Sequence, residues 1–134
     1  ALSSAASDVY KRQGVDYYYE GDPAVLAACM EKDYQEILID FGKVREEVFP
    51  EWLRCTKKVL VADLSEWKLE AFLGLLAEKG ESAKEWICMT AFGSEIMKQE
   101  IERQFHISLK QIPLSADAFS VDIRTMEWFA DIFK

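Results

Sequence analysis

The sequence predicts an α/β fold in which a parallel sheet carries helices on both faces. Short segments at 35–41, 57–62 and 85–90 are rich in apolar and β-branched residues, as buried strands are. Segments with helical periodicity separate them, and the connections are short. This βαβαβ alternation indicates parallel strands that are joined by helical crossovers.

The first half of the chain is expected to hold two strands and two helices. Residues 15–19 form an aromatic and β-branched run that favours a strand. Asp22, which a proline follows, can cap a helix. The strand at 35–41 comes next, and a helical stretch over 44–54 is interrupted by Pro50.

The second half repeats the alternation with clearer signals. After the strand at 57–62, Ser65 is expected to cap a helix that Gly80 ends. The remaining elements in chain order are a strand at 85–90, a helix opened by Gly93 and Ser94, a strand at 107–112 ended by Pro113, and a helix over 122–133.

Helical spacing also assigns a buried face to each of the three later helices. Apolar residues recur at intervals of three and four positions, which places them along one side of a helix. The residues expected to face inward are Leu69, Phe72, Leu73 and Leu76 in the first helix, Met97, Ile101 and Phe105 in the second, and Met126, Phe129, Ala130 and Phe133 in the third.

Composition limits the classes of protein to which the chain can belong. Its 134 residues, 50% of them hydrophobic, suit one globular domain with a real core. A net charge of −8 argues against a broad nucleic-acid-binding face. No apolar run approaches the roughly 20 residues of a transmembrane helix. Three scattered cysteines and one histidine favour reduced thiols in the cytoplasm over a zinc site or disulfide framework.

The N-terminal residues 1–13 fit no periodic pattern. Residues 7–13, SDVYKRQ, resemble an adapter-derived tail that recurs in translated environmental sequencing reads. We therefore expect residues 1–13 to be a non-native or disordered tail outside the fold. Residues 14–134 are then expected to form part of a single domain, and the chain to be a truncated piece of a longer protein.

Four segments occur in an order that points to a known family. Residues 33–42, DYQEILIDFG, have the pattern of a Walker B strand and the switch that follows it. Residues 55–61, 65–69 and 111–117 then match a later strand, the start of the next helix and a late Ile-Pro segment. From Val15 onward the chain thus resembles the C-terminal part of MinD/ParA-like ATPases, the deviant Walker group of P-loop NTPases with three-layer α/β/α domains.

The resemblance implies roles for four residues. Asp40 would be catalytic, binding magnesium through water and orienting the attacking water. Gly42 would let the backbone turn under the γ-phosphate. Thr90 lies where many relatives carry an Asn that reads the base, and Pro113 would shape the base pocket.

The resemblance also implies what the intact parent does. It would bind Mg-ATP, form a homodimer in the cytoplasm, and act by slow hydrolysis as a nucleotide-switched positioning or assembly factor. Partition, division, pilus or flagellar assembly and secretion all stay open, and its protein partner is unknown.

This sequence holds no phosphate-binding loop of the form GxxxxGK[ST], because none of its six glycines begins that pattern. We therefore expect the fragment itself to bind no nucleotide and to be inactive. Loss of the first strand would leave a strand edge exposed, which predicts aggregation or marginal folding.

Other interpretations stay open beside the ATPase. An Asp at a strand end, such as Asp40, often only caps a turn. The chain could be a nucleotide-independent α/β module for protein interaction, or a receiver-like or Rossmann-like small-ligand domain. A kinase is disfavoured, because the tripeptide Asp40-Phe41-Gly42 lacks the other kinase motifs. His106 is expected to lie at a helix end and to bind no ligand.

Overall fold

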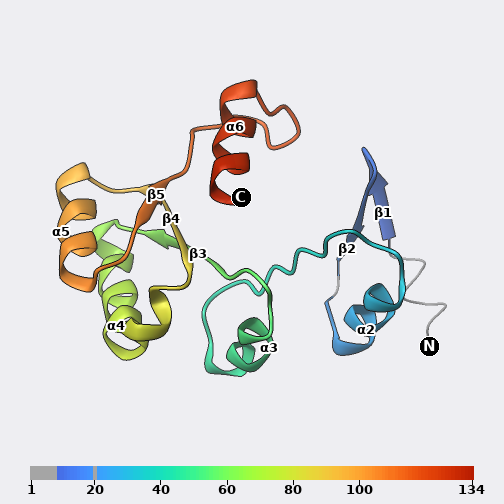
Figure 1. Ribbon diagram of the computed structural model, residues 1–134, viewed down its shortest axis with the longest axis horizontal. Coiled ribbons are helices and arrows are strands. Elements are labelled where there is room, and N and C mark those ends of the chain that lie inside the picture. Colours follow the sequence, from blue (N-terminus) through green and yellow to red (C-terminus); the bar gives the residue numbers. More distant parts are fainter. Residues whose placement is uncertain (1–8, 20) are drawn as a thin grey trace. The chain divides into compact units, whose positions relative to one another are not determined.

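The computed structural model describes residues 9–19 and 21–134 (Figure 1). It divides the chain into two compact units, Ala1–Val48 and Phe49–Lys134, and each unit is described by itself. The single domain expected over residues 14–134 stays a prediction.

A β-hairpin opens the first unit. Strands β1 (Val9–Arg12) and β2 (Val15–Tyr18) pair antiparallel. Gln13 and Gly14 form the loop between them with φ values of 53° and 79°, and a type I′ turn needs positive φ at both positions. Strand β2 is the one predicted at 15–19. Strand β1 falls inside the expected tail, of which residues 1–8 lie outside the described part.

Helix α2 (Pro23–Glu31) follows the hairpin and begins as predicted. The Asp22 carboxylate accepts a 2.8 Å hydrogen bond from the Val25 N–H, and Pro23 occupies the first helical position. The first N–H groups of a helix have no partner within the helix; the Asp22 carboxylate accepts from one of them, and Pro23 has no N–H that would need a partner. Val25 and Cys29 are the buried residues of α2.

The strand predicted at 35–41 is wrong for this structure, because none of these residues is assigned to a strand. Leu38, in the middle of the apolar run, is 93% exposed, and Ile37 and Ile39 are exposed as well. A strand requires a hydrogen-bonded neighbour, and no described strand pairs with this segment. The composition of the run fits a buried strand, but composition does not determine whether another strand lies beside it to pair with.

The helix predicted over 44–54 is realised as two short pieces. These are the 3-10 turn η1 (Glu46–Val48) and helix α3 (Phe49–Leu53). Pro50 does not interrupt α3, because it lies in the first turn, where helical N–H groups have no partner within the helix.

The second unit is built on a parallel sheet, as the sequence predicts. Strands β3 (Val59–Asp63), β4 (Ile87–Phe92) and β5 (Leu109–Gln111) form a three-stranded sheet in the order β3-β4-β5. Both pairings are parallel, so the carboxyl ends of all three strands meet at one edge. The α/β fold class is therefore confirmed.

Helices α4 (Glu66–Ala83) and α5 (Glu95–Phe105) pack their buried residues against one face of the sheet. Leu76 is completely buried, and Phe72 lies beside it in the core, as the helical spacing predicts. The core cluster comprises Leu60, Ala62, Leu64, Phe72, Leu76, Ala83, Trp86, Cys88, Ile101, Ile107 and Leu109.

Helix α6 (Ile123–Ile132) lies on the other side of the sheet. Lys110 of β5 alternates with the core residue Leu109, so its side chain points to the opposite face. Asp131 of α6 interacts electrostatically with Lys110, and the Lys57 Nζ donates a 2.7 Å hydrogen bond to the Phe133 carbonyl. Helices therefore flank both faces of the sheet.

The predicted inward face of the last helix is wrong. Met126 is 60% exposed, and Phe129, Ala130 and Phe133 are also exposed, whereas Thr125 is buried. Periodicity identifies an apolar side of α6, but it cannot say that this side meets the sheet. In α5 the outcome is mixed, because Ile101 is buried as predicted and Met97 is exposed.

Helix α4 runs past its predicted end. Gly80 was expected to stop the helix, but helical structure continues to Ala83. The backbone leaves helical geometry at Lys79, with φ −109° and ψ 15°. The helix is therefore kinked next to Gly80 and does not end there.

Candidate functional site

The carboxyl edge of the parallel sheet is the candidate site, because α/β proteins bind ligands at this edge. Two main-chain hydrogen bonds join the turns there. The Leu64 N–H donates to the Phe92 carbonyl at 3.2 Å, and the Ile112 N–H donates to the Thr90 carbonyl at 2.9 Å. The segments that leave β3, β4 and β5 are therefore fixed to one another.

Thr90 and Pro113, both predicted from the resemblance, come together at this edge. Pro113 directly follows Ile112, whose N–H is bonded to Thr90. Thr90 is only 1% exposed, and its hydroxyl donates a 2.8 Å hydrogen bond to the Phe92 carbonyl. That hydroxyl is thus already used within the end of β4.

The loop between β4 and α5 closely approaches the loop after β3. Gly93 has a φ of +140°, and a Cβ placed on it would lie 2.6 Å from the Leu64 Cβ. Only glycine fits such a position without strain. Ser94 then caps α5 by accepting a 3.1 Å hydrogen bond from the Met97 N–H.

Asp63 is a polar residue of this edge that the sequence analysis did not single out. Its carboxylate accepts a 2.9 Å hydrogen bond from the Ser65 N–H and lies 3.5 Å from the Lys68 Nζ. The Ser65 hydrogen bonds, followed by Lys68, hold the pKa of Asp63 below its usual value. The available signal was an Asp at the end of an apolar run in the sequence, a pattern that Asp63 shares with Asp40.

Asp40 and Gly42 belong to the first unit, and Thr90 and Pro113 belong to the second. The Asp40 Oδ1 accepts a 2.8 Å hydrogen bond from the Gly42 N–H, and Gly42 has a φ of +69°. This is the side-chain-to-backbone bond by which an Asp stabilises a turn. Asp40 is exposed, so its carboxylate is accessible to a hydrated cation.

A polar cluster in the first unit was also missed. The Tyr34 hydroxyl donates a 2.6 Å hydrogen bond to the Asp16 carboxylate and lies 2.8 Å from the Tyr18 hydroxyl. Lys32 donates a 3.0 Å hydrogen bond to that Tyr18 oxygen. The bond to Asp16 is the main cause that raises the pKa of Tyr34, and the bond to Tyr18 raises the pKa of Lys32. Residues 16, 18, 32 and 34 lie too far apart in sequence for spacing to reveal the cluster.

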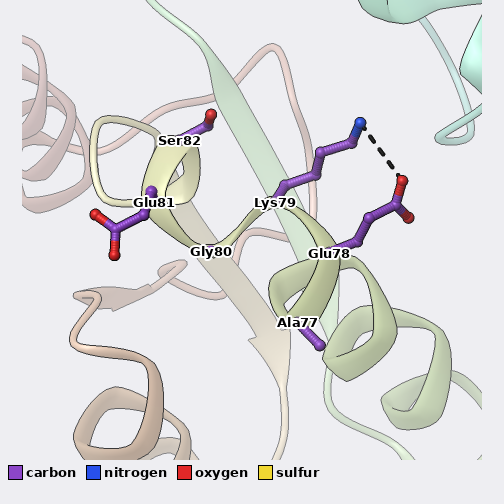
Figure 2. Close-up of a pocket in the computed structure, with 6 residues that line it drawn as sticks. All are labelled: Ala77, Glu78, Lys79, Gly80, Glu81 and Ser82. Carbon is purple, nitrogen blue, oxygen red and sulfur yellow. Dashed lines mark ion pairs between the residues drawn. The ribbon is translucent and has the colours of Figure 1, made fainter.

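A surface hollow lies at the kink of α4. Figure 2 shows that Ala77, Glu78, Lys79, Gly80, Glu81 and Ser82 line it, all from one helical segment. Lys79 turns toward Glu78, with 3.5 Å between the charged groups, and no second element closes the hollow. It lies near the end of α4 that leads into β4, opposite the carboxyl edge.

Among the described residues, no group of three or more His, Cys, Asp or Glu side chains is placed to hold a metal ion. Burial raises the pKa of the Cys88 thiol to about 11, which keeps it protonated. His106 ends α5 in the left-handed conformation, with φ 56°, as expected of a helix-end residue.

Among the described helices, none has the length and apolar character that crossing a membrane needs.

Comparison of the chain with known protein families, curated proteins and solved structures finds no significant match. Any functional assignment therefore rests on the residues themselves and on the geometry described above.

Proposed function

We propose that this chain is the C-terminal part of a MinD/ParA-like ATPase, whose intact form binds Mg-ATP and switches the position or assembly of a partner. The observation that carries the proposal is the meeting of Thr90 and Pro113 at the carboxyl edge of a parallel sheet. Pro113 lies in the matched late Ile-Pro segment, and Thr90 stands where many relatives carry the Asn that reads the base. A shared site requires these two positions to be neighbours.

The turn at Asp40 suits the role that the resemblance gives it. Magnesium keeps several waters in nucleotide sites and takes few protein carboxylates, so one exposed Asp is a sufficient ligand. When bound, Mg-ATP supplies the phosphoryl group and the cation that neutralises its charge. Asp40 would hold a metal-bound water and orient the attacking water, and the positive φ of Gly42 would bring its backbone close to the γ-phosphate.

The base pocket fits the family less well. The Thr90 hydroxyl is engaged by Phe92, so it offers no donor to a base in this conformation. Thr90 would then act by its position at the strand end, with Pro113 shaping the pocket wall. We expect weaker discrimination between nucleotide bases than an Asn at this position would give.

The intact parent would work in the cytoplasm as a homodimer that forms around its nucleotide. Its output would be the location or assembly state of a partner protein, as in partition, division, pilus or flagellar assembly, or secretion. Nothing in the chain selects one of these processes.

The first experiment is to extend the DNA sequence upstream of residue 14. An in-frame phosphate-binding loop with the deviant lysine would support the proposal, and a start codon near Gly14 without such a loop would overturn it. In the extended protein, Asp40→Asn should abolish ATP hydrolysis. Asp131→Asn, at an exposed carboxylate of α6 outside the matched motifs, is the matched control and should leave hydrolysis unchanged.

A nucleotide-independent interaction module is the second candidate. The exposed apolar side of α6, with Met126 and Phe129, is the observation that favours it, because large exposed apolar patches mark interaction surfaces. The start codon that would overturn the ATPase would favour this module.

A further inference from the structure

Helix α6 packs on the second unit with little buried apolar surface. Thr125 is the buried residue that it contributes, while Ile123, Met126 and Phe129 on its apolar side are exposed. Among the described residues, the core cluster and the apolar side chains packed against it include none from α6. Burial of apolar surface therefore contributes little to holding this helix in place.

A lysine two positions before β3 contacts the C-terminal end of α6. The Lys57 Nζ donates a 2.7 Å hydrogen bond to the Phe133 carbonyl and lies 5.6 Å from the centroid of the Phe133 ring. The last carbonyl groups of a helix have no partner within the helix, and a cation is attracted both to that end and to an aromatic face. One ammonium group thus holds the end of α6 in two ways.

A second polar contact reaches the opposite side of the sheet. Asp131 of α6, which pairs with Lys134 at 2.7 Å, also interacts electrostatically with Lys110 of β5. Strand β4 lies between β3 and β5. The last turn of α6, which contacts groups on both sides of β4, therefore crosses this central strand.

Met89 is the side chain of β4 that lies in this row. It is in register with Val61 of β3 and Lys110 of β5, and it alternates with the core residue Cys88, so it points to the face that carries α6. Met89 is 4% exposed although it is not a member of the core cluster, whereas Val61 is 60% exposed. The cover over Met89 therefore does not extend to Val61.

We propose that α6 is a strap that covers Met89 and opens as a unit, with the contact between Lys57 and Phe133 as its clasp. Opening would break a charge-assisted hydrogen bond and little apolar packing, so it should occur far more often than unfolding of the sheet, whose core lies on the other face. The open strap would add Met89 to the exposed Val61 and so create a larger apolar surface. This inference does not depend on Mg-ATP or on the proposed function.

Met89 is itself the reporter of opening. Hydrogen peroxide converts methionine to its sulfoxide where solvent reaches the sulfur, and peptide mapping by mass spectrometry follows each methionine separately. Met30 and Met126, which are 71% and 60% exposed, should oxidise rapidly in every variant and calibrate the reagent. In the unsubstituted chain, the initial oxidation rate of Met89 should be much lower than theirs.

Three lysine variants test the clasp. Lys57→Met keeps a long side chain but removes the ammonium, and should raise the initial oxidation rate of Met89 by roughly tenfold, the effect expected for loss of a hydrogen bond to a charged group. Lys57→Arg keeps a cation and should stay close to the unsubstituted chain. Lys84→Met is the matched control, because its ammonium pairs with Glu81 of α4, outside the strap.

Amide hydrogen exchange gives a second readout that separates opening of α6 from unfolding of the whole unit. The amides of α6 should exchange faster in Lys57→Met, and those of β4 should keep their rates. Circular dichroism confirms that each variant is folded.

Three results would overturn the inference. The first is oxidation of Met89 in the unsubstituted chain at the rate of Met126, which would show that α6 does not cover it. The second is an equal Met89 rate in Lys57→Met and Lys84→Met, which would exclude the clasp. The third is faster exchange in β4 together with α6, which would mean that the strap does not open by itself.

Discussion

Gly93 lies so close to Leu64 that a Cβ atom on the glycine would be 2.6 Å from the Leu64 Cβ. The two residues belong to the loops that follow β4 and β3, and their contact fixes the carboxyl edge of the sheet. The same glycine has a φ of +140°, a value that side-chain-bearing residues rarely adopt.

Gly93→Ala should therefore destabilise the second unit strongly. Backbone strain and the clash with Leu64 each cost about 1–3 kcal/mol, so we expect a loss of roughly 2–4 kcal/mol. Urea denaturation followed by tryptophan fluorescence measures it. Gly74→Ala is the control, because nothing lies within 4 Å of the Cβ it would add in α4. That change should stabilise by about 0.5–1 kcal/mol, and equal effects at the two glycines would contradict the close approach.

Leu76 tests the core that α4 forms against the sheet. Its side chain is completely buried, so Leu76→Ala removes buried methyl groups and leaves a cavity. The expected cost is about 2–5 kcal/mol in the free energy of unfolding. Leu114→Ala makes the same chemical change at a 98% exposed position and should cost less than about 0.5 kcal/mol.

Glu102 tests the outer edge of β5, where its carboxylate accepts a hydrogen bond from the Leu109 N–H. Glu102→Ala leaves the outward Leu109 N–H without its acceptor and should cost about 1–2 kcal/mol. Glu102→Gln keeps an acceptor oxygen and should cost less. Glu100→Ala removes only an exposed pair with Arg103 and is the control, with an expected effect of at most about 0.5 kcal/mol. A Glu102→Ala effect no larger than that control would exclude the capping role.

The sequence predicted the second unit better than the first. Leu69, Phe72, Leu73 and Leu76 recur at helical spacing and do pack in or against the core, because α4 lies on a sheet that buries one full side of it. The strands at β3 and β4 were found because both are apolar runs whose neighbours also form.

The wrong predictions share a physical cause. A local sequence pattern does not specify which other segment of the chain will pack or pair against it. The run at 37–39 is apolar enough for a buried strand, yet it has no described partner and stays exposed. Helix α6 has an apolar side around Met126, but its buried residue is Thr125. Strand β1 carries Lys11 and Arg12 and forms because β2 pairs with it.

Some residues of the candidate site were named from the sequence, and others were missed. Thr90 and Pro113 were named from the resemblance, Thr90 as a departure from its pattern, and the parallel sheet brings them together. The bond from Gly42 to Asp40 follows from local chain geometry. Asp63 and the Tyr34 cluster were missed, because their contacts depend on how the chain folds back.

Cys88 gives a prediction for pH dependence. Burial raises its pKa from 9.0 to about 11, so the native state keeps the thiol proton where the unfolded chain loses it. Its contribution to stability is present below pH 9 and is lost as the pH rises through about 11. Urea midpoints of the chain and of Cys88→Ala should therefore converge between these pH values.

In native protein at pH 8, a thiol reagent should modify Cys55 first and leave Cys88 unmodified, because Cys88 is both buried and protonated. Peptide mapping by mass spectrometry identifies the labelled residue. Early labelling of Cys88 would contradict its place in the core.

Tyr34 tests whether the polar cluster holds the first unit together. Its hydroxyl bridges Asp16 and Tyr18 of β2, so it ties the residues after α2 to the hairpin. Tyr34→Phe removes both bonds with little change in shape, and should speed amide hydrogen exchange in β2 (Val15–Tyr18). Tyr19→Phe is the matched control, because that ring is 77% exposed.

An alkaline titration gives an independent measure of the same cluster. The hydrogen bond to Asp16 raises the pKa of Tyr34, so its phenol should ionise at a higher pH than an ordinary tyrosine phenol. Difference absorbance in the ultraviolet should lose its latest step in Tyr34→Phe and keep that step in Tyr19→Phe. If both variants titrate alike, Tyr34 does not donate to Asp16 in solution. The chain leading from α2 to Asp40 would then not be anchored to the hairpin at this point.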